Sequence, residues 1–119
     1  MKKMKLIILI GLLFIIGCKQ TPQKEDSFKS LLKAVYTNDQ ELFKSTYSEG
    51  IRESETQNDW SKNFKEAKAN VIKLFGETYS LQDFKFSDEG NKVGIYFKGQ
   101  LMFKIAVKKE LKGWKLDER

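Results

Sequence analysis

The sequence predicts an α+β fold in which about three helices pack on one face of a three- to four-stranded antiparallel sheet. Between Phe28 and Phe75, apolar residues recur every three or four positions, which is the period of an amphipathic helix. From Tyr79 onward, apolar and polar residues alternate, which is the period of a half-buried strand. Such a sheet usually buries one face, and the preceding helices would cover it.

The segment before this domain has a composition of its own. It opens with MKKMK, continues with the apolar run Leu6–Ile16 and ends at Cys18, the only cysteine among 119 residues. As a helix this run would cover roughly 16 Å, about half of a bilayer's hydrocarbon core. A basic start, a short apolar run and a small residue before a cut site are typical of a secretory signal. We therefore expect residues 1–17 to be a signal peptide.

The end of this segment, Ile15-Ile16-Gly17-Cys18, resembles the lipobox of bacterial lipoproteins. The resemblance implies that the Cys18 thiol is lipidated and that a peptidase then cuts just before Cys18. Two or three acyl chains would replace the signal as an anchor, at roughly 0.8 kcal/mol per buried CH₂. The domain would then face the periplasm or the exterior from the cell membrane or the outer membrane. The alternative is a free cysteine at the end of a signal peptide or apolar helix.

Processing would also change the charge of the chain. The full chain carries 22 basic and 16 acidic residues, or +6, and loss of the three leading lysines leaves 19 basic residues, or +3. This modest charge on an exported domain argues against nucleic acid as a partner. Residues 18–26 are polar and contain the only proline, so we expect a tether there and a single domain over residues 27–119.

Part of the tether, Gln23–Asp26, is similar to signals that send some lipoproteins to the outer face of the outer membrane. Alternatively, Glu25, Asp26 and Ser27 cap the first helix, where acids favour the positive end of the helix dipole. The two interpretations are compatible with each other.

Two short helices are expected next. The first covers residues 27–38. A capping box, with Asn38 as the N-cap and Glu41 three residues later, would start the second helix, which would end at Gly50. The residues expected to face the core are Phe28, Leu31, Leu32 and Val35 in the first helix and Leu42, Phe43 and Tyr47 in the second.

A loop and a longer helix follow. Ile51–Asp59 is polar, which predicts a loop, and a third helix is expected from Asp59 to Phe75, with Gly76 as its stop. Its inward residues would be Trp60, Phe64, Ala67, Val71, Leu74 and Phe75.

Alternation predicts strands at residues 81–87, 92–98, 101–109 and 113–118, with a first turn at Asp88–Asn91. A two-residue loop at Gly99-Gln100 would place Ile95 opposite Lys104, whereas a three-residue loop would pair Ile95 with Ile105. We therefore predict an odd-length loop or a bulge in this hairpin.

Two stretches resemble the NTF2-like (cystatin-like) small lipoproteins of unknown function. AVYTNDQELFKSTYS matches their recurring first helix through Ala34, Asp39 and Phe43, and VKKELKGWKLDE matches their closing strand pair through Gly113, Trp114, Lys115 and Leu116. The resemblance covers roughly residues 27–117 and implies helices packed into a curved sheet to form a cone. In some members the cone is a ligand pocket, and in many it is filled. The full family often has more strands between its helices than are found here.

The residue types argue against catalysis. The chain has no histidine, and lipidation of Cys18 would leave no thiol, so we expect no metal, no cofactor and no enzyme activity. NTF2-like enzymes often use an aspartate and a tyrosine inside the cone. The candidates of the right type are Tyr36, Tyr47, Tyr79 and Tyr96 with Asp39 or Asp83.

The second face of the sheet is the candidate site. Residues 85–115 hold eight lysines against three acids, which predicts a docking surface for anionic lipid, polysaccharide or an acidic protein. The alternative is an ordinary solvated face whose lysines discourage edge-to-edge pairing. We expect a non-catalytic binding module, with a small-molecule carrier or a Tyr/Asp enzyme as alternatives. The residues of this face are Lys85, Tyr96, Lys98, Met102, Lys104 and Lys108.

Overall fold

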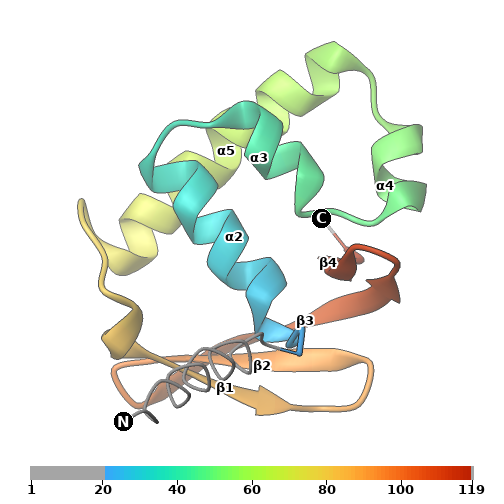
Figure 1. The fold of residues 1–119 in the computed structure, drawn as a ribbon. Helices are drawn as coiled ribbons and strands as arrows, with labels where there is room; N and C mark the ends of the chain where they lie inside the picture. Colours follow the sequence, from blue (N-terminus) through green and yellow to red (C-terminus); the bar gives the residue numbers. More distant parts are fainter. Residues whose placement is uncertain (1–20, 119) are drawn as a thin grey trace, which may run out of the picture.

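The computed structural model describes residues 21–118, so the predicted signal peptide and Cys18 lie outside the described residues. The helices come first along the chain and lie together on one side of the sheet (Figure 1). This confirms the predicted α+β class. Among residues 21–118, no helix is long and apolar enough to cross a membrane. The elements are α2 (Glu25–Tyr36), α3 (Gln40–Ser45), α4 (Glu49–Ser54), α5 (Gln57–Phe75), the 3-10 turn η1 (Leu81–Asp83), β1 (Phe84–Asp88), β2 (Lys92–Phe97), β3 (Gln100–Glu110) and β4 (Gly113–Leu116).

Helix α2 starts two residues before the predicted position. Glu25 and Asp26 lie in its first turn, and the Asp26 carboxylate accepts a hydrogen bond from the Gln23 backbone N–H at 2.8 Å. The acids therefore lie where they favour the helix dipole, as one of the two interpretations of this segment expects. The predicted inward residues of α2 are all buried.

The junction of α2 and α3 corrects the predicted capping box. Asn38 has a positive φ of 56°, and the Asp39 N–H donates to the Ala34 carbonyl at 2.8 Å, which closes α2 with a Schellman-type turn. The N-cap of α3 is Asp39, whose Oδ1 accepts from the Leu42 N–H at 3.0 Å. Asn38 therefore ends one helix, and the next residue begins the other.

The loop predicted at Ile51–Asp59 is wrong over residues 51–54, which belong to α4, and over residues 57–59, which begin α5. Helix α3 ends at Ser45, and Gly50 lies inside α4 instead of ending a helix. Helix α4 has no buried residue, so its sequence lacks the apolar face by which a helix is recognised.

Helix α5 matches its prediction closely. A reciprocal capping box starts it, since the Asp59 N–H donates to Thr56 Oγ1 at 3.1 Å and the Thr56 N–H donates to Asp59 Oδ2 at 3.2 Å. The helix ends at Phe75, and Gly76 follows with a φ of 103°. Leu74 departs from the prediction because it is 44% exposed.

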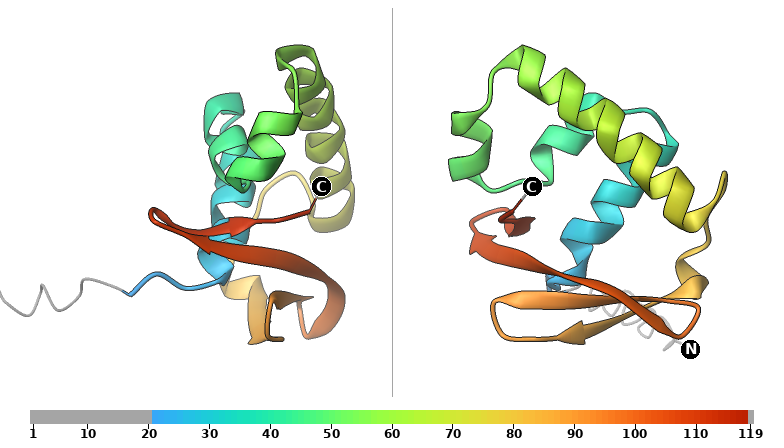
Figure 2. Two further views of the ribbon diagram at one scale, coloured as in Figure 1. Left: turned by 90° about the vertical axis from the view of Figure 1, so that its right-hand side faces the viewer. Right: turned by 180° about the vertical axis from the view of Figure 1, so that it is seen from behind.

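The four strands form an antiparallel meander in the order β1-β2-β3-β4, and β3 curves away from β2 toward β4 (Figure 2). The strand predicted from residue 81 begins at Phe84, after η1. The predicted bulge is confirmed: Tyr96 pairs with Leu101 and Ile95 with Phe103, so Met102 is the extra residue. The predicted pairing of Ile95 with Ile105 is therefore wrong.

The turn between β2 and β3 is a two-residue loop of Lys98 and Gly99, one residue earlier than the Gly99-Gln100 position considered from the sequence. Both residues have positive φ, 51° and 85°, as the tight type I′ hairpin requires. The bulge, and not an odd-length loop, restores the apolar alternation after this turn.

Aromatic rings fill the space between the helices and the sheet. Phe28 of α2 is 1% exposed, and its ring centroid lies 5.9–6.3 Å from those of four other phenylalanines, one on α5 and three on strands. A second cluster surrounds Phe43, with centroids at 5.0–5.8 Å. The neighbours of Phe28 are Phe75, Phe84, Phe86 and Phe103, and those of Phe43 are Tyr47, Trp60 and Phe64.

Candidate docking surfaces

The predicted basic face runs across three strands, and the register shows how its members meet. Lys85 on β1 is the direct cross-strand partner of Tyr96 on β2. Lys98 lies in the β2–β3 turn, with its Nζ 5.3 Å from the centroid of the Phe97 ring. Lys104 and Lys108 pair outside the set, with Gly94 and Lys115. Met102 departs from the prediction, because it is the bulge residue and packs against the hydrophobic core.

An acid compensates the charge at the centre of this face. Glu89 Oε1 lies 3.5 Å from Lys104 Nζ, and Glu89 Oε2 accepts a hydrogen bond from Ser87 Oγ at 2.7 Å. The Ser87 hydrogen bond and the nearby Lys104 ammonium together lower the pKa of Glu89. Among residues 21–118, the other lysines of this face, Lys85, Lys98 and Lys108, form no ion pair within 4.0 Å.

Gly94 makes room for this arrangement. Gly94 is buried directly opposite Ser87, and a Cβ on it would lie 2.4 Å from Ser87 Oγ, which is closer than real Cβ contacts allow. A side chain at this position would push the serine hydroxyl off Glu89.

Gly94→Ala should therefore destabilise the protein by about 1 kcal/mol, because the serine must rotate and abandon its hydrogen bond. In a Ser87→Ala background the same change should be neutral or stabilising by about 0.5 kcal/mol, since alanine lowers the entropy of the unfolded chain. Urea unfolding of the four proteins of this double-mutant cycle measures the coupling. An equal effect of Gly94→Ala in both backgrounds would contradict this account of the glycine.

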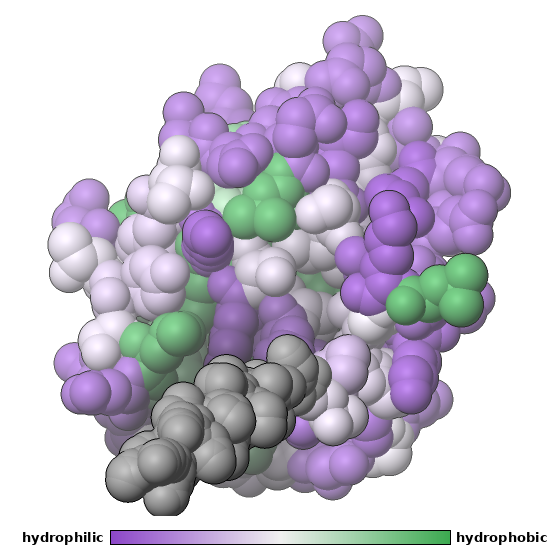
Figure 3. Space-filling model, viewed as in Figure 1, coloured by the Kyte–Doolittle hydropathy of each residue, from purple (hydrophilic) through white to green (hydrophobic). Residues whose placement is uncertain are grey.

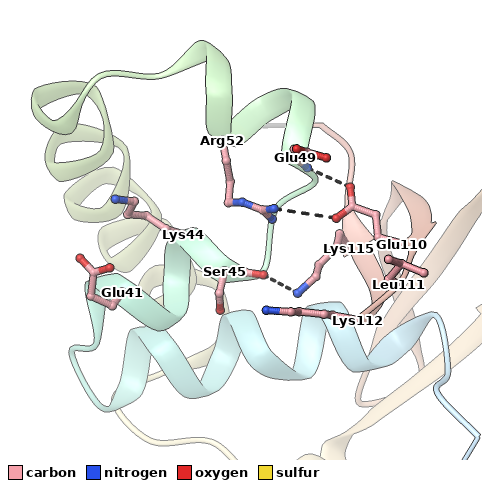
Figure 4. Close-up of a pocket in the computed structure, with 9 residues that line it drawn as sticks. All are labelled: Glu41, Lys44, Ser45, Glu49, Arg52, Glu110, Leu111, Lys112 and Lys115. Atoms are coloured by element: carbon pink, nitrogen blue, oxygen red, sulfur yellow. Dashed lines mark hydrogen bonds and ion pairs between the residues drawn. The ribbon is translucent and has the colours of Figure 1, made fainter.

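A second surface feature is a groove of about 490 Å³ between α3, α4 and the β3–β4 hairpin (Figure 4). Four cationic and three anionic side chains surround it. Backbone hydrogen bonds hold β4 to the segment between α3 and α4. The Leu116 N–H donates to the Thr46 carbonyl at 2.7 Å, and the Leu116 carbonyl accepts from the Ser48 N–H at 2.8 Å. The groove is lined by Glu41, Lys44, Ser45, Glu49, Arg52, Glu110, Leu111, Lys112 and Lys115.

Polar contacts tie the walls of this groove together. Glu110 accepts from the Glu49 N–H at 2.8 Å and lies 4.0 Å from the Arg52 guanidinium. Lys115 Nζ donates to the Ser45 carbonyl at 2.8 Å, and its partial burial, followed by the nearby Arg52, lowers its pKa. Sequence reasoning missed this groove because its polar residues come from distant segments, one of them the unexpected α4.

The candidate catalytic residues make contacts that stabilise the fold. Asp39 caps α3, and the Tyr36 hydroxyl donates to the Gly76 carbonyl at 2.8 Å while its ring stacks on Tyr79 at 4.5 Å. Burial is the main cause that raises the pKa of Tyr36. Tyr47 lies in the aromatic core and Asp83 in η1. In the part of the chain that the structure describes, no group of three or more acidic, cysteine or histidine residues could hold a metal ion.

Comparisons of the chain with protein-family models, with curated proteins and with solved structures found no match.

Proposed function

We propose that this protein is a lipid-anchored lipoprotein of the bacterial cell envelope whose domain is a non-catalytic binding module. The position of the only cysteine carries the proposal. Cys18 ends an apolar run that is too short to span a bilayer, and it precedes the first described residue of the domain by three positions. A lipid on Cys18 would hold this domain close to the membrane surface.

We further propose that the domain is a small relative of the NTF2-like lipoproteins with a filled cone. Helices on one side of a curved four-stranded sheet support the relationship. Phe64 and Phe97, which would line the cavity of a carrier, instead pack against Phe43 and Phe75 with ring centroids 5.0 and 4.9 Å apart. This packing favours the outer surface over the interior as the place of binding.

The surface that we assign to a partner is the basic face of the sheet, above all its end around Lys85, Tyr96 and Lys98. Lys85 opposite Tyr96, with Lys98 two residues further along the chain in the turn, suits an acidic protein or another anionic component of the envelope. The Glu89–Lys104 pair would then mark the limit of the strongly basic part.

A photo-cross-linking amino acid in place of Tyr96 tests this surface in living cells. We expect a discrete adduct whose yield falls about tenfold when Lys85 and Lys98 are both changed to glutamate, because two attractive contacts become repulsive. Changing Lys62 and Lys65, which are exposed on α5, to glutamate gives the same charge difference elsewhere and should leave the adduct intact. Equal yields from the two double variants would contradict the assignment of this face.

A further inference from the structure

The structure shows where the chain that leads to Cys18 meets the domain. Lys24 Nζ lies 2.6 Å from Asp88 Oδ1 and 2.6 Å from the Gly90 carbonyl oxygen, which fixes the start of α2 to the β1–β2 turn. Pro22 lies beside the β3–β4 hairpin, since a Cβ on Gly113 would be 3.8 Å from the Pro22 Cβ. The first described residues are therefore held against two turns of the sheet.

This attachment limits the distance between the anchor and the hairpin. Cys18 precedes Thr21 by three residues, which span at most about 11 Å when fully extended. The β3–β4 turn projects on the same side of the domain as these first residues (Figure 2, left). If Cys18 carries a lipid, the turn must lie near the bilayer surface.

The composition of the turn suits that position. Leu111 is fully exposed at its tip, and Figure 3 shows an apolar projection among hydrophilic atoms at the edge where this hairpin lies in Figure 1. Lys112 follows it in the two-residue turn, and Lys108 and Lys109 precede it on β3. Most two-residue turns hold small or polar residues, so a fully exposed leucine in this turn is unusual.

The one acid of the hairpin, Glu110, is directed away from the tip. It faces the groove, where it contacts Arg52 and the backbone of α4, and Figure 4 shows Leu111 outside that contact. One residue pair from the turn, two ammonium groups lie near the Trp114 ring: Lys24 Nζ is 5.3 Å and Lys109 Nζ 6.0 Å from its centroid. The tip therefore presents the apolar side chain of Leu111, with the exposed Lys112 lining the adjacent groove and Lys109 beside Trp114.

We propose that the β3–β4 turn is a second, non-covalent contact with the bilayer that holds Cys18, and that the bilayer carries anionic phospholipid. Leu111 enters the boundary between headgroups and acyl chains, and Lys109 and Lys112 bind headgroup phosphates. The contact would add a second attachment point beside Cys18 and so limit the orientation of the domain relative to the bilayer. It directs α5, on the opposite side of the domain, away from the membrane (Figure 2). This inference rests on the proposed lipid anchor.

The test uses the full protein, purified with its lipid and reconstituted in vesicles of phosphatidylethanolamine and phosphatidylglycerol. With Cys18 acylated, the variant Leu111→Cys offers a thiol for an environment-sensitive fluorophore at the turn. Lys65→Cys on the exposed side of α5 is the matched control. We expect blue-shifted emission and protection from aqueous iodide at position 111, and water-like emission with full quenching at position 65.

Charge reversal gives a second readout with the same label. Adding Lys109→Glu and Lys112→Glu should lower the ratio of membrane-docked to undocked turns about fivefold for each lysine lost. Water-like emission at both labelled positions, in protein that floats with the vesicles, would overturn this inference and leave the anchor standing. If the protein without substitutions takes up the thiol label on Cys18 and does not float with the vesicles, the proposed lipid anchor is wrong. This inference is then wrong as well.

Discussion

Replacing Cys18 by serine should leave the chain as an uncleaved precursor without lipid, because the serine hydroxyl does not replace the thiol as the acceptor of the diacylglycerol. The expected effect is complete loss of incorporated labelled fatty acid and a larger apparent size, since residues 1–17 stay attached. Metabolic labelling with palmitate followed by electrophoresis measures both. Partition into the membrane fraction is a poorer readout, because the retained apolar run Leu6–Ile16 still binds lipid.

The matched control for this variant is Gln20→Ser, which places a serine in the tether and keeps the cysteine. It should be cleaved and lipidated as the unvaried chain is. Normal cleavage and labelling of the Cys18→Ser protein would show that the cysteine has another role.

Replacing Phe28 by alanine should destabilise the domain by about 3–5 kcal/mol, a large share of the roughly 5–15 kcal/mol that holds a typical domain folded. Phe28 is the point at which α2, α5 and two strands, β1 and β3, meet, so its removal leaves a cavity between the helices and the sheet. Urea unfolding followed by circular dichroism measures the change.

Leu74→Ala is a control for this prediction, because Leu74 is a helical apolar residue that lies half in solvent. It should cost about 0.5 kcal/mol. Similar costs for the two variants would mean that Phe28 is not the centre of the core.

The elements that could be predicted are those whose own side chains build the core. The buried residues of α2 and the residues from Trp60 to Phe75 in α5 repeat with the helical period, and local glycine and asparagine geometry ends both helices. The β2–β3 bulge could be predicted as well, because without it Ile95 would face a lysine.

What could not be predicted depends on contacts between distant segments. Helix α4 buries no residue and is held at its start and along its length by partners elsewhere, such as Asp117, which accepts from Ser48 Oγ at 2.7 Å. The sequence placed Lys24 in a polar tether, because nothing local shows that its partner is Asp88, 64 residues away. Both the groove and the position of the β3–β4 turn beside the first described residues follow from such contacts.

The candidate basic face was only partly predictable. Alternation placed Lys85, Tyr96 and Lys104 on one side of the sheet, and the register agrees with that placement. It could not show that Glu89 returns from the β1–β2 turn to compensate Lys104, because that contact needs Ser87 and the bare backbone of Gly94.

The most direct test of the central claim is the intact mass of the protein purified from membranes of its host. We expect a chain that begins at Cys18 and carries a diacylglycerol on its sulfur, with no thiol available to alkylating reagents. A chain that begins elsewhere, or one whose Cys18 thiol is free, would contradict the anchor and with it the proposed function.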